Sequence, residues 1–394
     1  MSRSGFRATG TALLTLALVL AASVAAPWAT AHDPQPRVPQ PAVPQAGAQP
    51  SVVPQQKPPR AGAQQSILPP PSKPVAPQAA TPQAGVPKPG ELPPGITAQA
   101  VFGAMGPYAV ASTAVLHPCK ESIWGFVQEL VIRAFGNNSE PTCTYAFPQG
   151  GDSPIAVTLY YPQDIRDLSA APPIVFVPGI DSDVGMHDAS ARHWASHGFV
   201  VALASDFSNS LLEMPALGLA TVVSANRDEK SPLHGKVDLS RTVFAGHSAG
   251  GQAAQQSGAA FPAIAHLIDP QFKVAAVMAL EPGPLALGSM ISVPTLMLTG
   301  HDDFVVFDVA WPRLWQYNLV NAPAYLVNAK GATHFNPLDD LEHNKFTGIM
   351  MAWLLHITMH DETAGKFFLG PEWLLPSDTS FLEVYRNEVA ERLH

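Results

Sequence analysis

Short apolar runs recur between residues 155 and 327 with helix-like stretches between them, and this pattern constrains the fold more than any other feature of the sequence. A continuous apolar run of four to eight residues is typical of a strand that is covered on both faces. Strands that alternate with helices form βαβ units, so the sequence predicts an α/β fold with a mostly parallel central sheet and helices on both faces. The expected strands cover 155–161, 173–178, 199–203, 242–245, 274–280, 295–298 and 324–327, and the expected helices cover 189–196, 211–225, 249–260, 308–319 and 344–359.

Segment 120–145 departs from this alternation, because residues 123–135 fit either an amphipathic helix or a buried strand. The two cysteines of the chain, Cys119 and Cys143, bracket it. In an oxidising compartment, an even pair without CxxC spacing is more often bridged than bound to zinc. We therefore expect a disulfide that staples an insertion near the first strands, and no metal site.

The N-terminus has the three parts of an export signal. Arg3 and Arg7 precede an apolar run over 12–22, and Ala29-Thr30-Ala31 is a small-residue cleavage site. An uncleaved anchor is the alternative, but the run is short for a membrane span, and no later segment offers about 20 uninterrupted apolar residues. We expect a signal peptide over 1–31, a secreted or periplasmic protein, and no stable membrane insertion.

A proline-rich stretch follows, since 19 of the 41 prolines lie between Pro34 and Pro94. With almost no aromatic residues it cannot bury enough apolar surface to offset the entropy of ordering it. We expect an extended linker over 32–97 that acts as a spacer or contacts the cell envelope, followed by one folded domain over 98–394.

The charge balance bears on partners. The formal charge is −9, and removal of residues 1–31 takes away two arginines and no acid, which leaves −11. Such a field repels nucleic acid and anionic lipid surfaces, so we expect no nucleic-acid partner.

The pentapeptide GHSAG at 246–250 follows an expected strand and opens an expected helix. This is the context of a nucleophile elbow, in which Ser248 sits on a sharp turn at a helix N-terminus. Two backbone N–H groups should hold the oxyanion that forms when the serine attacks an acyl carbon. We expect them from Ala249, next to the serine, and from Ile180, in the loop after strand 173–178.

A serine needs a base, and the base needs an orienting carboxylate. The strand over 295–298 leads to Asp302 and Asp303, and the strand over 324–327 leads to His334. Both places lie just beyond strand carboxyl ends, where α/β sheets gather their chemistry. We expect His334 as the base and Asp303 as the acid, with Asp302 as the alternative, and we expect His247 to pack under the elbow.

Asp181 and Asp183 lie close together in the loop after strand 173–178 and superficially resemble a calcium loop. The later ligands of an EF-hand are missing. We therefore expect two solvated acids at the mouth of a cleft.

At these residues the chain resembles the bacterial cutinases and polyester hydrolases, including the poly(ethylene terephthalate) hydrolases, which are relatives of the dienelactone-hydrolase-like esterases. The resemblance implies an α/β-hydrolase fold, a catalytic domain over 98–394, and a secreted serine carboxylic-ester hydrolase with the triad Ser248, Asp303 and His334. It implies no cofactor and a small or polymeric ester as the partner. The matching stretches are GPYAV at 106–110, LYYP at 159–162, VPG at 177–179, SHGFVV at 196–201, GKVD at 235–238, GHDD at 300–303, GATHF at 331–335 and AWL at 352–354.

Two positions depart from the family pattern. Ile180 stands where the family has an aromatic residue, and Gly283 stands where it has a tryptophan. Their absence removes stacking surface for an aromatic diacid. A lipase or phospholipid acyl-hydrolase could use the same triad, and a secreted binding protein on a hydrolase-like fold is the alternative from another class.

Overall fold

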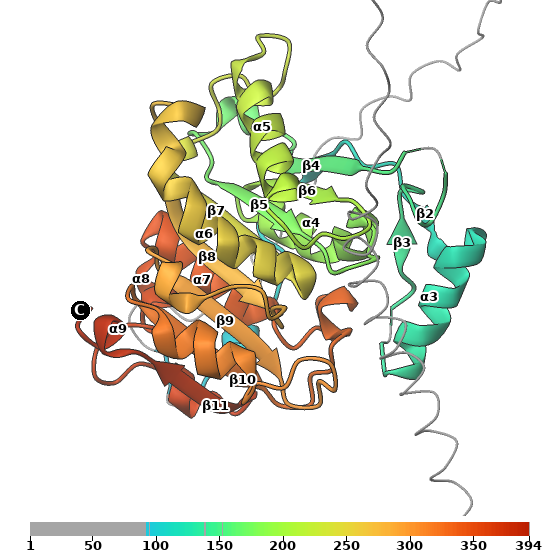
Figure 1. Ribbon diagram of the computed structural model, residues 1–394. Helices are drawn as coiled ribbons and strands as arrows, with labels where there is room; N and C mark the ends of the chain where they lie inside the picture. Colours follow the sequence, from blue (N-terminus) through green and yellow to red (C-terminus); the bar gives the residue numbers. More distant parts are fainter. Residues whose placement is uncertain (1–91, 94, 138, 152, 394) are drawn as a thin grey trace, which may run out of the picture. The chain divides into compact units, whose positions relative to one another are not determined.

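The computed structural model describes residues 92–93, 95–137, 139–151 and 153–393. The expected signal peptide over 1–31, and residues 32–91 and 94 of the expected linker, lie outside the described residues. Within the described part, a nine-stranded sheet has the order β1-β4-β6-β5-β7-β8-β9-β10-β11 (Figure 1). Neighbours from β6 to β10 are parallel, whereas the pairs β1–β4, β4–β6 and β10–β11 are antiparallel. The strands are β1 (Val110–Ser112), β4 (Ala156–Pro162), β5 (Pro173–Val177), β6 (Val200–Ser205), β7 (Thr242–His247), β8 (Val274–Leu280), β9 (Thr295–Gly300), β10 (Ala324–Ala329) and β11 (Phe381–Arg386).

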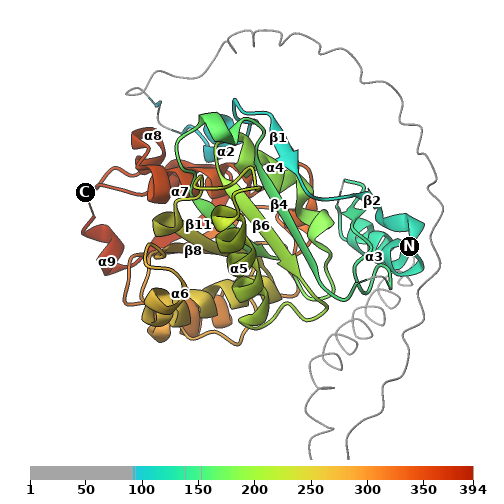
Figure 2. The same ribbon diagram turned by 90° about the horizontal axis from the view of Figure 1, so that it is seen from above.

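Helices cover both faces of this sheet, which explains why the central strands are apolar throughout. Ile174 and Phe176 of β5 pack with α4 and α7 on one face, whereas Val175 packs with α5 and α6 on the other. Figure 2 shows the two layers on opposite sides of the sheet. The helices are α2 (Ala98–Phe102), α3 (Ile123–Ala134), α4 (Asp188–Ser196), α5 (Glu213–Arg227), α6 (Ala249–Ile268), α7 (Thr347–Met359), α8 (Glu362–Gly365) and α9 (Glu388–Glu391).

The predicted α/β fold and mostly parallel sheet are confirmed, but the helix predicted over 308–319 starts later and is not a regular α-helix. Residues 308–319 form turns, then a π-helical segment (Pro312–Gln316), then a 3-10 turn (Tyr317–Leu319). Pro312 lacks an N–H and therefore cannot continue an α-helical ladder from the turn before it. The helix expected to end at 260 instead continues to Ile268, since Pro262 removes a single backbone bond from its interior.

The segment left open as helix or strand is the helix α3. Its first turn is capped by Ser122, whose Oγ accepts a hydrogen bond of 2.9 Å from the N–H of Gly125. Two short strands, β2 (His117–Pro118) and β3 (Thr142–Cys143), pair antiparallel at its base. In the part of the chain that the structure describes, no helix combines the length and the apolar character needed to cross a bilayer.

Candidate active site

Ser248 occupies a sharp turn between β7 and α6, with φ 55° and ψ −118°. This left-handed backbone is strained for a serine and persists only where the surroundings fix it. Glycines on both sides leave the necessary room: a Cβ on Gly246 would lie 2.3 Å from Gly250, and one on Gly250 would lie 1.9 Å from the carbonyl oxygen of Val177. The GxSxG spacing therefore produces a tight elbow that presents the serine at a helix N-terminus.

Backbone hydrogen bonds fix this elbow to its neighbours. The N–H of Ser248 donates to the carbonyl of Leu280 over 2.8 Å, which ties the turn to the end of β8. The carbonyl of Ser248 accepts from the N–H of Gly283 over 2.9 Å and from that of Gln252 over 3.1 Å. The position of the hydroxyl is thus held by two adjacent strand ends and the first turn of α6.

His334 lies between Ser248 and a buried carboxylate. Its Nε2 is 3.0 Å from the Ser248 Oγ, and its Nδ1 is 2.8 Å from Asp303 Oδ2. The other oxygen of Asp303 accepts from the N–H groups of Val305 (2.7 Å) and Val306 (2.9 Å), which keeps the carboxylate pointed at the imidazole. Asp303 is 2% exposed, whereas Asp302 is exposed, so the structure brings Asp303 and not its neighbour to His334.

Ile180 and Ala249, the expected oxyanion donors, flank the same serine. Ala249 follows it directly, and a Cβ built on Gly179 would lie 3.3 Å from Ser248 Cβ, which places the Gly179–Ile180 peptide beside Ser248. Both residues are partly exposed. The loop is held from behind, because Asn209 Nδ2 donates to the carbonyl of Gly179 over 2.7 Å.

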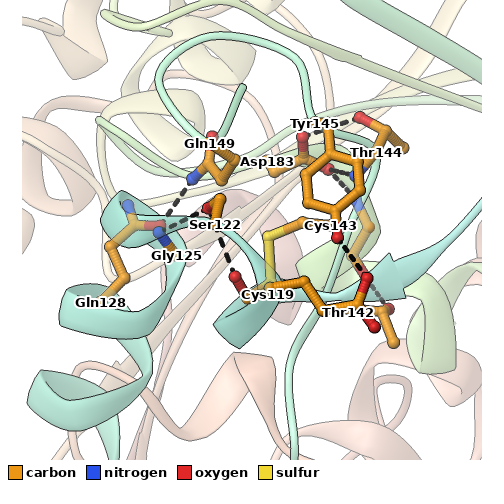
Figure 3. Close-up of a disulfide and its surroundings, with 12 residues drawn as sticks. Cys119, Ser122, Gly125, Gln128, Thr142, Cys143, Thr144, Tyr145, Gln149 and Asp183 are labelled. Carbon is orange, nitrogen blue, oxygen red and sulfur yellow. Dashed lines mark hydrogen bonds between the residues drawn. A yellow bond between two sulfur atoms is a disulfide. The ribbon is translucent and has the colours of Figure 1, made fainter. Parts of the chain in front are cut away.

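Side chains of the insertion donate hydrogen bonds to Asp181, the residue that follows Ile180. Asp181 has φ 59°, and its carboxylate oxygens accept from Trp124 Nε1 of α3 over 2.9 and 3.0 Å. Gln128 Nε2, one turn further along α3, donates to the carbonyl of Asp181. Gln149 Nε2 in turn donates to Gln128 Oε1 over 2.6 Å, a contact drawn in Figure 3. α3 therefore positions the loop that contains Ile180 and Asp181 from outside the sheet.

The expectation of two solvated acids in this loop is wrong. Asp183 is 2% exposed and accepts hydrogen bonds from the N–H (2.9 Å) and the hydroxyl (2.7 Å) of Thr144 (Figure 3). Asp181 is partly buried under Trp124. Asp183 also accepts from the N–H of Gly185 in its own loop over 2.7 Å, but Trp124 and Thr144 belong to the insertion, so the loop sequence alone could not indicate these contacts.

The other end of α3 reaches the loops that carry Asp303 and His334. Phe135 stacks against Phe304 with ring centroids 4.4 Å apart and against Phe335 at 5.7 Å. Asn137 Nδ2 donates to the carbonyl of Phe335 over 3.3 Å. The insertion thus extends from the loop of Asp181 to Phe335, the residue after His334.

The disulfide between Cys119 and Cys143 is present and holds the base of this insertion (Figure 3). The bridged residues are 24 positions apart. A loop of this length stabilises the folded state by about 3.5 kcal/mol in the chain-entropy account.

The double variant Cys119→Ser/Cys143→Ser should lose about 3.5 kcal/mol of unfolding free energy, because the unfolded chain regains the entropy of the open loop. Urea unfolding with and without a reductant measures this. Reductant should lower the midpoint of the wild-type protein and leave that of the double variant where it is. Equal wild-type midpoints under both conditions would contradict the expectation.

Asp181 should make stability depend on pH. Burial raises the pKa of Asp181 to about 6, although hydrogen bonds from Trp124 and Gln128 act in the opposite direction. Its unfolded pKa is about 3.9, so the folded state binds the extra proton, and stability falls as pH rises from about 4 to about 6. Asp181→Asn keeps an acceptor for Trp124 and removes this titration. In thermal unfolding, the stability of the variant relative to the wild-type protein should increase from about pH 4 to about pH 6 and stay constant above that. A constant difference across this window would show that Asp181 does not titrate there.

No sequence pattern indicated Glu281, which is fully buried and lies 3.5 Å from His334. Among the described residues, His247, Glu281 and His334 are the one group whose potential ligand atoms lie within 4.8 Å of one another. His334 Nδ1 already donates to Asp303, and His247 Nε2 donates to the carbonyl of His334 over 2.9 Å. We therefore assign no metal to this group.

Comparison with known proteins agrees with the resemblance seen in the sequence. Residues 150–388 match the model of the PET hydrolase-like family. The chain is also similar to Cutinase est2 of Thermobifida alba, with 28% identity over 239 residues, which covers 58% of this chain and 72% of that protein. The insertion over 120–145 lies before the residues that the family model matches. Since the family model covers more than half of the chain, this protein belongs to the PET hydrolase-like family of α/β hydrolases.

Proposed function

We propose that this protein is a secreted serine carboxylic-ester hydrolase that works through an acyl-enzyme on Ser248. The observation that carries the proposal is the hydrogen-bonded row from Asp303 through His334 to the hydroxyl of Ser248. Membership in the PET hydrolase-like family and similarity to a cutinase support an ester as the substrate.

In the first half of the reaction, Ser248 Oγ attacks the ester carbonyl carbon while His334 Nε2 takes the hydroxyl proton. Asp303 accepts from Nδ1 of the imidazole and stabilises the imidazolium that forms. The N–H groups of Ile180 and Ala249 donate to the oxyanion of the tetrahedral intermediate. When the intermediate collapses, the bond to the alcohol breaks, and His334 returns the proton to the leaving oxygen.

In the second half, water attacks the acyl-enzyme and His334 Nε2 takes its proton. The acid is released, and the proton returns to Ser248. Every proton in this cycle moves between the substrate, water, Ser248 and His334, so the proposed steps call for no metal or organic cofactor.

The proposed organisation is a signal peptide over 1–31, a linker over 32–97 and a catalytic domain over 98–394. The disulfide between Cys119 and Cys143 supports an oxidising compartment, which agrees with export. Mass spectrometry of the protein recovered from the medium or periplasm tests this: a mature N-terminus at His32 supports export, whereas full-length protein confined to the cytoplasm contradicts it.

The test of the enzymatic proposal is a fluorophosphonate probe on the purified protein, with peptide mapping, beside a p-nitrophenyl ester series of increasing acyl length. Phosphonylation at Ser248 together with turnover of short esters supports the proposal. The absence of both labelling and turnover would favour a secreted binding protein that uses a hydrolase-like fold.

A lipase-like preference for aggregated esters is a second candidate, and one observation favours it. Four apolar side chains on the outer face of α3 follow helical spacing and are exposed to solvent by 89% (Ile123), 56% (Phe126), 43% (Val127) and 62% (Leu130). The same helix contacts the loop of Ile180 and Asp181 through Trp124, which donates to the Asp181 carboxylate. An apolar stripe at the mouth of a site suits contact with an ester aggregate.

The double variant Ile123→Gln/Leu130→Gln tests this second candidate. If the stripe docks on aggregates, the variant should lower the ratio of emulsified to dissolved ester turnover about tenfold or more, since burial of one such side chain is worth about 1.5–3 kcal/mol. Leu267→Gln is the matched control, because Leu267 is 74% exposed near the far end of α6. Equal ratios in all three proteins would remove the lipase-like candidate.

A further inference from the structure

Glu281 is a buried acid that the proposed mechanism does not use. It follows the last residue of β8 and is 0% exposed. Its backbone has φ 45°, a left-handed conformation that is uncommon for a glutamate. Its N–H donates to the carbonyl of Leu298 in β9 over 2.7 Å, which fixes the residue between two strand ends.

A buried carboxyl is costly unless its oxygens are satisfied. Glu281 Oε2 lies 3.2 Å from His247 Nε2 and 3.5 Å from His334 Nδ1, whereas Oε1 has no hydrogen-bond partner among the described residues. A buried carboxyl with an unsatisfied oxygen destabilises the fold, so the presence of Glu281 here points to a role in function.

Two acids therefore face one nitrogen of the proposed base. The single N–H on His334 Nδ1 lies 2.8 Å from Asp303 and 3.5 Å from Glu281, so Asp303 holds it in the resting protein. The charged or titratable groups that face Glu281 are His247, His334 and Asp303, and His187 lies behind His247 with ring centroids 5.7 Å apart. Burial, and then the charge of Asp303, raise the pKa of Glu281 well above its usual range.

We propose that Glu281 is a second positioning residue for His334, a carboxylate able to accept the Nδ1 proton when Asp303 is absent. The inference rests on the proposed function, since it takes His334 as the base. In the wild-type protein Glu281 accepts from His247 Nε2, which also donates to the main-chain carbonyl of His334 and so holds the loop that carries the base. When the charge at position 303 is removed, one of the two causes of the raised pKa of Glu281 disappears. The ionised Glu281 can then accept the hydrogen bond from His334 Nδ1, if its Oε2 moves closer than the present 3.5 Å.

The experiment compares Asp303→Asn, Glu281→Gln and the double variant, with kcat measured from pH 6 to 10 on a short soluble ester. In a serine hydrolase with one orienting acid, Asp→Asn costs about 10⁴-fold in kcat. Here we expect Asp303→Asn alone to cost about 10²-fold at neutral pH, Glu281→Gln alone less than tenfold, and the double variant the full loss of about 10⁴-fold. The same kcat for Asp303→Asn and for the double variant at every pH would overturn the proposal.

The pH profile of Asp303→Asn provides a second measurement that changes nothing at position 281. If Glu281 replaces the missing acid, kcat of this variant should keep rising above the pH at which the wild-type rate has levelled, because Glu281 must first lose its proton. A profile parallel to that of the wild-type protein would contradict the proposal. Asp302→Asn is the matched control, since Asp302 is an exposed neighbour, and its profile should follow the wild-type one.

Ser248→Ala, assayed alongside, distinguishes a failure of the proposed function from a failure of the proposed role of Glu281. If Ser248→Ala is inactive while the double variant equals Asp303→Asn, the proposed function stands and the role of Glu281 fails. If Ser248→Ala keeps wild-type turnover, the proposed function itself fails. Thermal unfolding of each variant identifies losses that come from folding, and Glu281→Gln preserves the volume of the side chain.

Discussion

Ser248→Ala is expected to lower kcat for ester hydrolysis by about 10⁶-fold, because the variant has no nucleophile to form the acyl-enzyme. In the wild-type protein the Ser248 hydroxyl lies 3.0 Å from His334 Nε2, and the two groups should act as a unit. The double variant Ser248→Ala/His334→Ala should therefore be no worse than Ser248→Ala alone. Steady-state turnover of a p-nitrophenyl ester, corrected for the spontaneous reaction, measures both.

Ser257→Ala is the matched control for this loss. It makes the same chemical change on the same helix, α6, where the Ser257 hydroxyl only donates to the carbonyl of Ala253 over 2.7 Å. Its kcat should stay within a few-fold of the wild-type value. A Ser248→Ala protein with wild-type turnover would move the nucleophile elsewhere, even though the elbow remains.

Gly250→Ala should also have a large effect, this time through the backbone. The added Cβ would lie 1.9 Å from the carbonyl oxygen of Val177 and 2.3 Å from that of Pro178. Neither oxygen can retreat without moving the end of β5, which leads into the loop of Ile180. We expect an unfolding free energy lower by about 1–3 kcal/mol and a kcat lower by at least about 10²-fold, the cost of misplacing reacting groups by about 1 Å.

Thermal unfolding and kcat, measured together, separate the two parts of this effect. Gly151→Ala is the control, because no atom lies within 4 Å of a Cβ added there. It should match the wild-type protein in both measurements. A stable and fully active Gly250→Ala variant would show that the elbow tolerates a side chain, and the close approach of α6 to β5 would then have no bearing on catalysis.

Much of the fold could be predicted, because its signals are local and periodic. The strands β5, β6, β7, β9 and β10 are buried along their whole length, and continuous apolar runs announce such strands. The edge strands β1 and β11 were not predicted, because none of their residues is fully buried and neither strand has such a run. The helix expected over 308–319 starts later and has π and 3-10 geometry, which shows the limit of predicting an α-helix across a proline, here Pro312.

The sequence by itself determined the alternation of strands and helices and the elbow at Ser248, because these depend on residues close together in the chain. It also determined the chain order of serine, acid and histidine, because each of the three follows its own local strand pattern. Tertiary structure alone decided which of two adjacent acids meets His334, because Asp302 and Asp303 differ only in which way the loop turns them. It also brought Trp124 to Asp181 across 57 positions and buried Glu281 behind His334. Such contacts depend on where the sheet and the insertion set distant residues in space, and no local spacing encodes that.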